Sequence, residues 1–110
     1  MQPFWKAGSV SSRDGLRLAT WEAGAAPDSG APVVIFVHGY PEQHGVWDLV
    51  ARELAADHRL VSYDVRGAGA SEAPADRAGW LLERLLDDLD LVIREVAGGG
   101  PVHLVGHDWG

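Results

Sequence analysis

The feature that most constrains this chain is a short apolar segment that runs directly into a pentapeptide with glycine at both ends. Residues 102–105 read Val-His-Leu-Val, and residues 106–110 read Gly-His-Asp-Trp-Gly. A sharp strand-to-helix turn of this form, a nucleophile elbow, holds its central side chain out at the tip. Glycines leave room for the tight turn, where a Cβ would collide. We therefore expect Asp108 at the tip, with a positive φ that costs about 1–3 kcal/mol and must be enforced by the fold.

An aspartate at this tip favours a different reaction from a serine at the same place. Its side chain is ionised at neutral pH, whereas a serine hydroxyl needs a base and then acylates through a tetrahedral intermediate. Attack of Asp108 on an ester carbonyl would give an anhydride, but attack on an sp³ carbon gives an ordinary ester that water can hydrolyse. The residue therefore predicts opening of an epoxide or displacement at an alkyl carbon. The alternative role for Asp108 is a helix N-cap, and the flanking glycines and the upstream strand favour the nucleophile.

The rest of the chain predicts an α/β fold with a mostly parallel sheet and an N-terminal antiparallel hairpin. Asp14-Gly15 is a hairpin turn signal between two expected strands, residues 8–12 and 16–22. The unbroken apolar run over residues 33–37 is typical of a strand buried on both faces. Helices are expected over residues 46–56 and 80–96, and further strands over residues 60–63 and 102–105. We expect the leucine stripe of the second helix to lie in the core.

Composition limits the classes of partner. The chain has 110 residues and a net charge of -7, and a nucleic-acid partner would demand a basic surface instead. It has no cysteine, so it has no disulfide and no thiolate metal ligand. Residues 1–6 show no basic segment followed by an apolar core, and no apolar run approaches the ~20 residues of a membrane span. We expect a cytoplasmic protein with a small-molecule substrate and no nucleic-acid, membrane or cofactor partner.

Three motifs in the same order and spacing resemble the α/β-hydrolase superfamily, specifically its epoxide hydrolase and haloalkane dehalogenase branch. They are His38-Gly39-Tyr40-Pro41 with Trp47 beyond it, Asp64-Val65-Arg66-Gly67-Ala68-Gly69-Ala70-Ser71, and Gly106-His107-Asp108-Trp109-Gly110. The resemblance covers nearly the whole chain, but only the N-terminal part of the family's catalytic domain. Residues 1–110 are therefore expected to be one incomplete α/β-hydrolase domain, truncated after the elbow, without the cap and the C-terminal half.

The resemblance also implies roles for individual residues. Asp108 would be the nucleophile, and the backbone N–H groups of Tyr40 and Trp109 would form the oxyanion hole. The Tyr40–Pro41 peptide would be cis. The residues expected to support these motifs are His38, Gly39, Pro41, Gly106, His107 and Gly110. The family's catalytic histidine, its acid and its cap tyrosines all follow the nucleophile, so the 110-residue fragment alone is expected to be inactive.

Three functions remain open on these grounds. The aromatic residue at Tyr40, followed by Pro41 and Glu42, resembles epoxide hydrolases, whereas dehalogenases more often place Asn or Glu at that position. Trp109 is compatible with both activities, since its indole N–H could hold a halide. Epoxide hydrolysis is preferred, haloalkane dehalogenation is the alternative, and a non-catalytic binding remnant is the third if the chain naturally ends at residue 110. The loop over residues 64–71 also resembles bacterial proteins in which this domain is fused to a short-chain dehydrogenase.

Several polar residues are assigned structural roles. His38 and His107 flank turns, where the family uses them for local hydrogen bonding rather than proton transfer. His103 and His107 lie four apart, but the Val/Leu pattern there predicts a strand, so no metal pair is expected. The spacing of Gly67 and Gly69 fits no phosphate loop. The residues expected to form an ion pair or a turn are Arg66 and Asp64, the one expected to pack beside the site is Trp47, and those expected to be solvated are His44 and His58.

Overall fold

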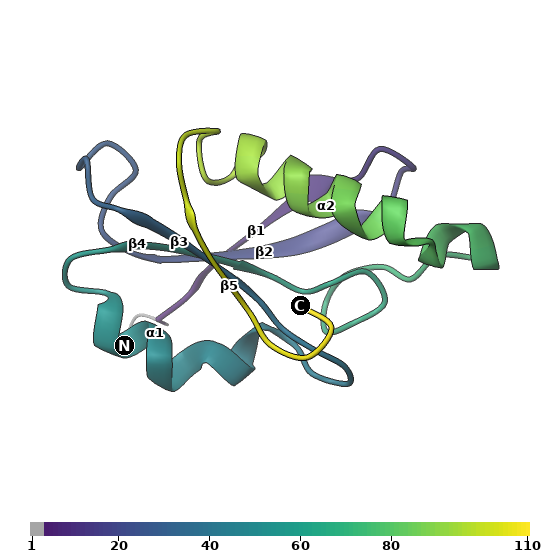
Figure 1. Ribbon diagram of the computed structural model, residues 1–110, viewed down its shortest axis with the longest axis horizontal. Helices are drawn as coiled ribbons and strands as arrows, with labels where there is room; N and C mark the ends of the chain where they lie inside the picture. The colour runs from purple at the N-terminus through teal and green to yellow at the C-terminus, as the bar shows by residue number, and fades with distance from the viewer. Residues whose placement is uncertain (1–3) are drawn as a thin grey trace.

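The valine-rich segment predicted as a buried strand lies near the centre of a five-stranded sheet (Figure 1). The computed structural model describes residues 4–110, so part of the N-terminal segment considered above lies outside the described residues. The strands are β1 Lys6–Ser11, β2 Arg17–Gly24, β3 Val33–Val37, β4 Arg59–Tyr63 and β5 His103–Gly106. Their order across the sheet is β1-β2-β4-β3-β5.

The sheet is mixed in direction. Strand β3 pairs parallel with both β4 and β5. The hairpin of β1 and β2 is antiparallel, as its turn signal predicts, and β2 joins the sheet by antiparallel pairing with β4. The parallel strands are therefore the three that carry the motifs at their carboxyl ends, which is the edge where open α/β sheets bind ligands.

The two faces of β3 explain its lack of polar alternation. Val34 and Phe36 point into one apolar cluster, which includes Trp47 and Ala51. Ile35 and the residues two positions before and after it point into a second cluster on the other face. This cluster includes Val92 of the second helix. A strand covered on both faces needs apolar residues at every position, because successive side chains point to opposite sides. Figure 1 shows one helix on each side of the sheet.

Each predicted helix is divided into a short 3₁₀ turn and an α-helix. The 3₁₀ turn η1 His44–Trp47 precedes α1 Asp48–Leu54, and η2 Arg77–Trp80 precedes α2 Leu82–Glu95. The side chain of Gln43 accepts a hydrogen bond from Gly45 N and caps η1, while Asp76 caps η2. Leu81 has extended backbone angles (φ -63°, ψ 148°), so η2 cannot continue into α2. The boundary expected at Trp80 therefore falls two residues later.

The expectation that the leucine stripe of α2 lies wholly in the core is wrong for its N-terminal half. Val92 is fully buried, but Leu81, Leu82 and Leu86 are 55%, 64% and 55% exposed. The helix also buries Asp88, which is 1% exposed, because that carboxylate pairs with a buried arginine. Among the described residues, no helix combines the length and apolarity required of a membrane span.

Candidate functional site

Parallel pairing of β3 and β5 brings two of the motifs together at one edge of the sheet. Val37 at the end of β3 pairs with Gly106 at the end of β5. The next contact is a hydrogen bond from His107 N to Val37 O, at 3.3 Å. The segment after β3 that begins at His38 and the segment around Asp108 therefore leave the sheet side by side.

Asp108 lies at the tip of the turn that follows β5. Its φ is 63°, and it is the one non-glycine residue with a positive φ in the described part of the chain. The expected left-handed conformation is thus confirmed. A Cβ on Gly110 would overlap the carbonyl oxygen of Val37, and a Cβ on Gly106 would lie 2.6 Å from the carbonyl carbon of Gly110. Glycine at both ends of the pentapeptide is therefore required by close backbone packing.

The backbone of the segment after β3 faces this aspartate. Tyr40 N donates a hydrogen bond to Asp108 Oδ2 at 3.0 Å. A Cβ on Gly39 would lie 2.9 Å from the same oxygen and would overlap Asp108 Cβ, so only glycine permits this approach. The Tyr40–Pro41 peptide is cis, as expected. Trp109 is 85% exposed, and its backbone N–H donates no hydrogen bond to Asp108 within residues 4–110.

His38 is held by hydrogen bonds to both ring nitrogens. Val65 N donates to Nε2 at 2.9 Å, so in the neutral ring the proton lies on Nδ1, which donates to Gly39 O at 2.8 Å. The residue is 3% exposed. With both nitrogens engaged and no solvent access, this ring has no free site for proton transfer, and it joins the segment after β3 to the segment after β4.

His107 and Trp47 have simpler surroundings. The side chain of His107 is 68% exposed, and its Nδ1 lies 3.5 Å from Glu42 Oε1. Trp47 is 9% exposed and packs at a tilt on Phe36, with ring centroids 5.1 Å apart. Within residues 4–110, no cluster of three or more potential metal-binding side chains occurs.

Asp64 lies directly after β4, and its carboxylate accepts four hydrogen bonds. Oδ1 accepts from the backbone N and the Nδ1 of His44, both at 2.9 Å. Oδ2 accepts from Ala70 N at 2.9 Å and from Trp21 Nε1 at 3.3 Å. Burial alone would raise the pKa of Asp64, but the hydrogen bonds from Ala70 and His44 outweigh it and lower that pKa below its ordinary value. This carboxylate therefore organises the loop as a structural acceptor.

The expectation that His44 is solvated is wrong. Its side chain is 17% exposed, and its ring stacks on Trp21 with centroids 3.9 Å apart. Its bond to Asp64 was missed because nothing in the spacing of residues 38–47 distinguishes a buried histidine from a surface one. His58, the other histidine expected to be solvated, has a 27% exposed side chain and pairs with neighbouring Asp57.

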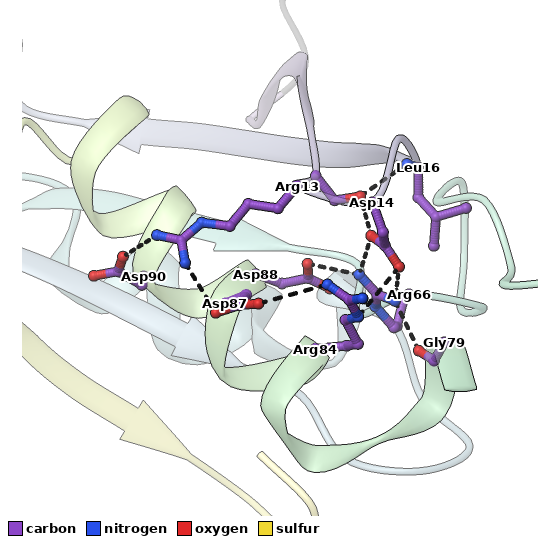
Figure 2. Close-up of polar contacts among 10 residues, drawn as sticks. Arg13, Asp14, Leu16, Arg66, Gly79, Arg84, Asp87, Asp88 and Asp90 are labelled. Atoms are coloured by element: carbon purple, nitrogen blue, oxygen red, sulfur yellow. Dashed lines mark hydrogen bonds and ion pairs between the residues drawn. The ribbon is translucent and has the colours of Figure 1, made fainter. Parts of the chain in front are cut away.

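Arg66 forms the buried ion pair that the sequence predicts, but with partners other than Asp64. Figure 2 shows its guanidinium between Asp14, in the turn of the hairpin, and Asp88 on α2. Nε and Nη2 donate hydrogen bonds to the carboxylate of Asp88, at 2.7 and 2.8 Å. Nη1 and Nη2 each donate a hydrogen bond of 2.9 Å to Asp14. The remaining donor bonds Gly79 O at 2.7 Å. All five N–H donors are used, so none is left for a substrate.

The charges of this cluster shift one another's protonation. Hydrogen bonds from Arg66 and then Ser12 hold the pKa of Asp14 well below its usual range. Asp88 and Asp14 raise the pKa of Arg66 above its ordinary value. Asp14 and Arg66 therefore remain ionised throughout the neutral range. The cluster joins the hairpin, η2 and α2 to the loop over residues 64–71.

A cavity of about 1120 Å³ is lined by Tyr40, whose backbone N bonds Asp108, and by Trp109, which follows Asp108 in the chain. Its lining comes from the segments after β3, β4 and β5 and from the partly exposed apolar face of α2. Its large apolar lining residues include Tyr40, Trp80, Leu82, Leu86, Leu104 and Trp109. The arrangement offers a carboxylate, a backbone donor aimed at one of its oxygens, and an apolar surface beside them.

Comparisons with known proteins identify the family to which this fold belongs. A sequence profile of the α/β hydrolase fold matches residues 32–110. A Mycobacterium tuberculosis protein named "Probable oxidoreductase EphD" is 44% identical over 101 residues, which are 92% of this chain and 17% of that protein. The mouse (Mus musculus) protein named "Epoxide hydrolase 4" is 36% identical over 86 residues, which are 78% of this chain and 24% of that protein.

A solved structure of similar shape is that of epoxide hydrolase VrEH1 from Vigna radiata, with a TM-score of 0.86 and 32% sequence identity. The match covers 97% of this chain and 33% of that one, so the chain spans about a third of the length of this relative and less of the curated ones. The profile covers most of the chain. The chain therefore belongs to the α/β hydrolase fold family, on its epoxide hydrolase branch.

Proposed function

We propose that the full-length protein is an epoxide hydrolase in which Asp108 is the nucleophile. The observation that carries this proposal is the 3.0 Å hydrogen bond from Tyr40 N to Asp108 Oδ2. A donor fixed on Oδ2 leaves the other oxygen, Oδ1, which accepts no hydrogen bond among the described residues, as the attacking atom. The turn presents this side chain in an exposed position and at a positive φ, as the tip of a nucleophile elbow requires.

The reaction begins with attack of Asp108 Oδ1 on an epoxide carbon. The carbon–oxygen bond of the epoxide breaks, its oxygen takes up a proton, and an alkyl-enzyme ester forms. Water then attacks the ester carbonyl, and the developing oxyanion is the former Oδ2. Tyr40 N–H already bonds this oxygen in the free carboxylate, and Trp109 N–H is the proposed second donor. Collapse of the tetrahedral species releases the diol and restores Asp108.

The groups that protonate the epoxide oxygen and activate the water follow the nucleophile in the family that this chain resembles. We therefore assign neither role to a residue of this chain. His38, the nearest buried histidine to the site, has both nitrogens engaged and is unsuited to either. The apolar lining of the cavity favours epoxides on hydrocarbon-rich molecules over charged ones.

Two experiments on the full-length protein test the assignment. Acid-quenched intact-mass analysis after mixing with an aliphatic or aryl epoxide should show an adduct equal to the mass of the epoxide. Asp108→Asn should abolish the adduct, because an amide is a poor nucleophile. Asp57→Asn, at a side chain that is 79% exposed and outside the site, should keep it. Single turnover in ¹⁸O-water should place the label on Asp108 and leave it out of the first diol released.

Each result separates competing functions. Label appearing in the first diol would mean that water attacks the epoxide directly, and would overturn the nucleophilic role of Asp108. Halide release from a haloalkane at a rate comparable with epoxide turnover would favour the dehalogenase alternative. The oxidoreductase name belongs to the mycobacterial relative, of which this chain matches only 17%.

A further inference from the structure

We propose that His44 is a positioning residue, which holds the loop over residues 38–44 so that Tyr40 N–H faces Asp108. The inference rests on the proposed function for its catalytic consequence, but the geometry it describes can be measured without activity. His44 does not line the cavity itself and makes no hydrogen bond to Asp108, so it acts through the backbone of this loop.

The loop is held at both ends by two adjacent residues that follow β4. At its start, the ring of His38 accepts a hydrogen bond from Val65 N at 2.9 Å. At its end, His44 donates two bonds of 2.9 Å to Asp64 Oδ1, one from its backbone and one from its ring. Tyr40 lies between these two attachments, at His38 and His44. The position of its N–H relative to the sheet therefore depends on the bonds of both histidines.

Between these ends, the loop makes short-range contacts. Glu42 N donates to Gly39 O at 2.9 Å, and the Gln43 side chain accepts from Gly45 N at 2.7 Å. Tyr40 itself is 80% exposed, and its side chain therefore contributes little to holding the loop. Local turns preserve the shape of a loop but do not fix its position on the protein. In the described residues, the polar contacts that fix this position are the bonds at His38 and His44, the Tyr40–Asp108 bond itself, and a longer contact of 3.5 Å between Glu42 Oε1 and His107 Nδ1.

The surroundings of His44 suit a fixed ring. One face stacks on Trp21 at an interplanar angle of 13°, and the edge of Trp5 packs against it at 82°. Asp64 also accepts from Trp21 Nε1, so the same carboxylate holds the histidine and the ring on which it stacks. Because an ionised carboxylate only accepts hydrogen bonds, Nδ1 of His44 carries the proton in either charge state. The ring is thus oriented by a charge-assisted bond and by aromatic packing together.

Two substitutions separate the hydrogen bond from the packing. His44→Phe keeps an aromatic ring on Trp21 but removes the bond from the ring to Asp64. His44→Asn loses the stack but offers an amide N–H close to the position of Nδ1. Displacement of a reacting group or an oxyanion donor lowers rates by about 10–100-fold. We therefore expect His44→Phe to lower kcat of the full-length protein at least about tenfold with KM nearly unchanged, and His44→Asn to restore kcat to within about threefold.

His58→Phe is the matched control, because His58 also bonds an aspartate through Nδ1, at 2.7 Å, but lies between α1 and β4. It should leave kcat unchanged. The step affected by His44→Phe should be hydrolysis of the ester, so the adduct on Asp108 should accumulate in this variant. A general loss of folding would instead lower the melting temperature and the amount of active enzyme. It would not change the ratio between the rate of adduct formation and the rate of ester hydrolysis.

Amide hydrogen exchange tests the geometry itself. In His44→Phe, the peptide covering residues 38–44 should exchange at least about tenfold faster than in the wild type, and in His44→Asn near the wild-type rate. Unchanged exchange and unchanged kcat in His44→Phe would overturn the inference, as would equal impairment in both variants. If the wild-type protein forms no adduct, the nucleophile proposal fails, and the exchange measurement alone then decides whether His44 positions the loop.

Discussion

At the scale of single residues, the site depends on the absence of a side chain at Gly39. A methyl group there would lie 2.9 Å from Asp108 Oδ2 and would overlap Asp108 Cβ. We expect Gly39→Ala to push the carboxylate away from Tyr40 N and to lower the rate of adduct formation about a hundredfold, because displacements of about 1 Å have that effect. Stopped-flow or quench measurements of adduct formation in the full-length protein would check this.

Gly100→Ala is the control for this substitution. A Cβ at Gly100 would meet nothing within 4 Å, and the residue has no positive φ. Its adduct formation should match that of the wild type. If Gly39→Ala retained the wild-type rate, the close approach of this glycine to Asp108 would be irrelevant to the reaction.

The sequence predicted the residues whose spacing is tied to backbone geometry. The positive φ of Asp108 was predictable because its flanking glycines are needed by a turn of fixed shape, and the cis Tyr40–Pro41 peptide because it belongs to a motif of the family that the chain resembles. His44 was not recognisable, since its role depends on Trp21 and Asp64, which lie far from it in the sequence. Contacts of this kind follow from the pairing of β2 with β4, which no local pattern encodes.

At the scale of secondary structure, the Arg66 cluster determines how α2 lies against the rest of the chain. Removal of one partner from a buried ion pair leaves an uncompensated charge and typically destabilises a protein by about 3–5 kcal/mol. Arg66 has a fully buried side chain, and that of Asp88 is 2% exposed. Asp88→Ala should therefore lower the free energy of unfolding by about that amount, measured by urea denaturation.

The neighbouring aspartate gives the comparison. The side chain of Asp87 is 30% exposed and pairs with Arg13 at 3.1 Å (Figure 2). Exposed pairs of this kind contribute about 0–1 kcal/mol, so Asp87→Ala should change the unfolding free energy by less than about 1 kcal/mol. Equal losses in the two variants would mean that α2 is held by its apolar contacts and not by Arg66.

The elements themselves were predicted to different degrees. Residues 33–37 were predicted as a strand with the observed bounds, because a run covered on both faces is apolar throughout. The helix expected over residues 80–96 has the right place, and its apolar stripe packs in the core at the C-terminal half but not at the N-terminal half. Its hydrophobic stripe predicts burial of Leu82 and Leu86, whereas the ion pair with Arg66 buries Asp88 instead. A buried charge pair overrides periodicity here, and periodicity alone cannot reveal its partner.

At the scale of the whole molecule, the protonation shifts predict how stability depends on pH in acid. The pKa values of Asp14 and Asp64 are both lowered from the ordinary value of 3.8 by hydrogen bonds and nearby charge. In acid, the unfolded chain therefore takes up protons at these carboxylates before the folded one does. Their stabilisation is complete well above pH 4 and is lost as the pH falls through the ordinary value toward the lowered ones. Urea midpoints should fall between about pH 5 and pH 2.5.

Asp14→Asn tests the share of this dependence that comes from the Arg66 cluster. The variant should be less stable than the wild type at neutral pH and should lose less further stability in acid, so the two curves should converge as the pH falls. Parallel curves would mean that Asp14 titrates alike in the folded and unfolded chain, contrary to its bonds with Arg66.

Tyr63 predicts a second loss of stability, which occurs as the pH rises rather than as it falls. Burial, and then the negative charge of Asp88, raise the pKa of this 3% exposed tyrosine above its ordinary value of 10.0. Above pH 10 the unfolded chain therefore loses this proton while the folded chain keeps it, so stability is complete below about pH 10 and declines as the pH rises further. Tyr63→Phe should make the decline of the urea midpoint between about pH 9 and pH 11.5 shallower, whereas Tyr40→Phe, at an 80% exposed side chain, should leave its slope unchanged. Identical slopes in the wild type and Tyr63→Phe would show that other groups cause the loss of stability in alkali, and that the buried hydroxyl of Tyr63 does not couple folding to pH.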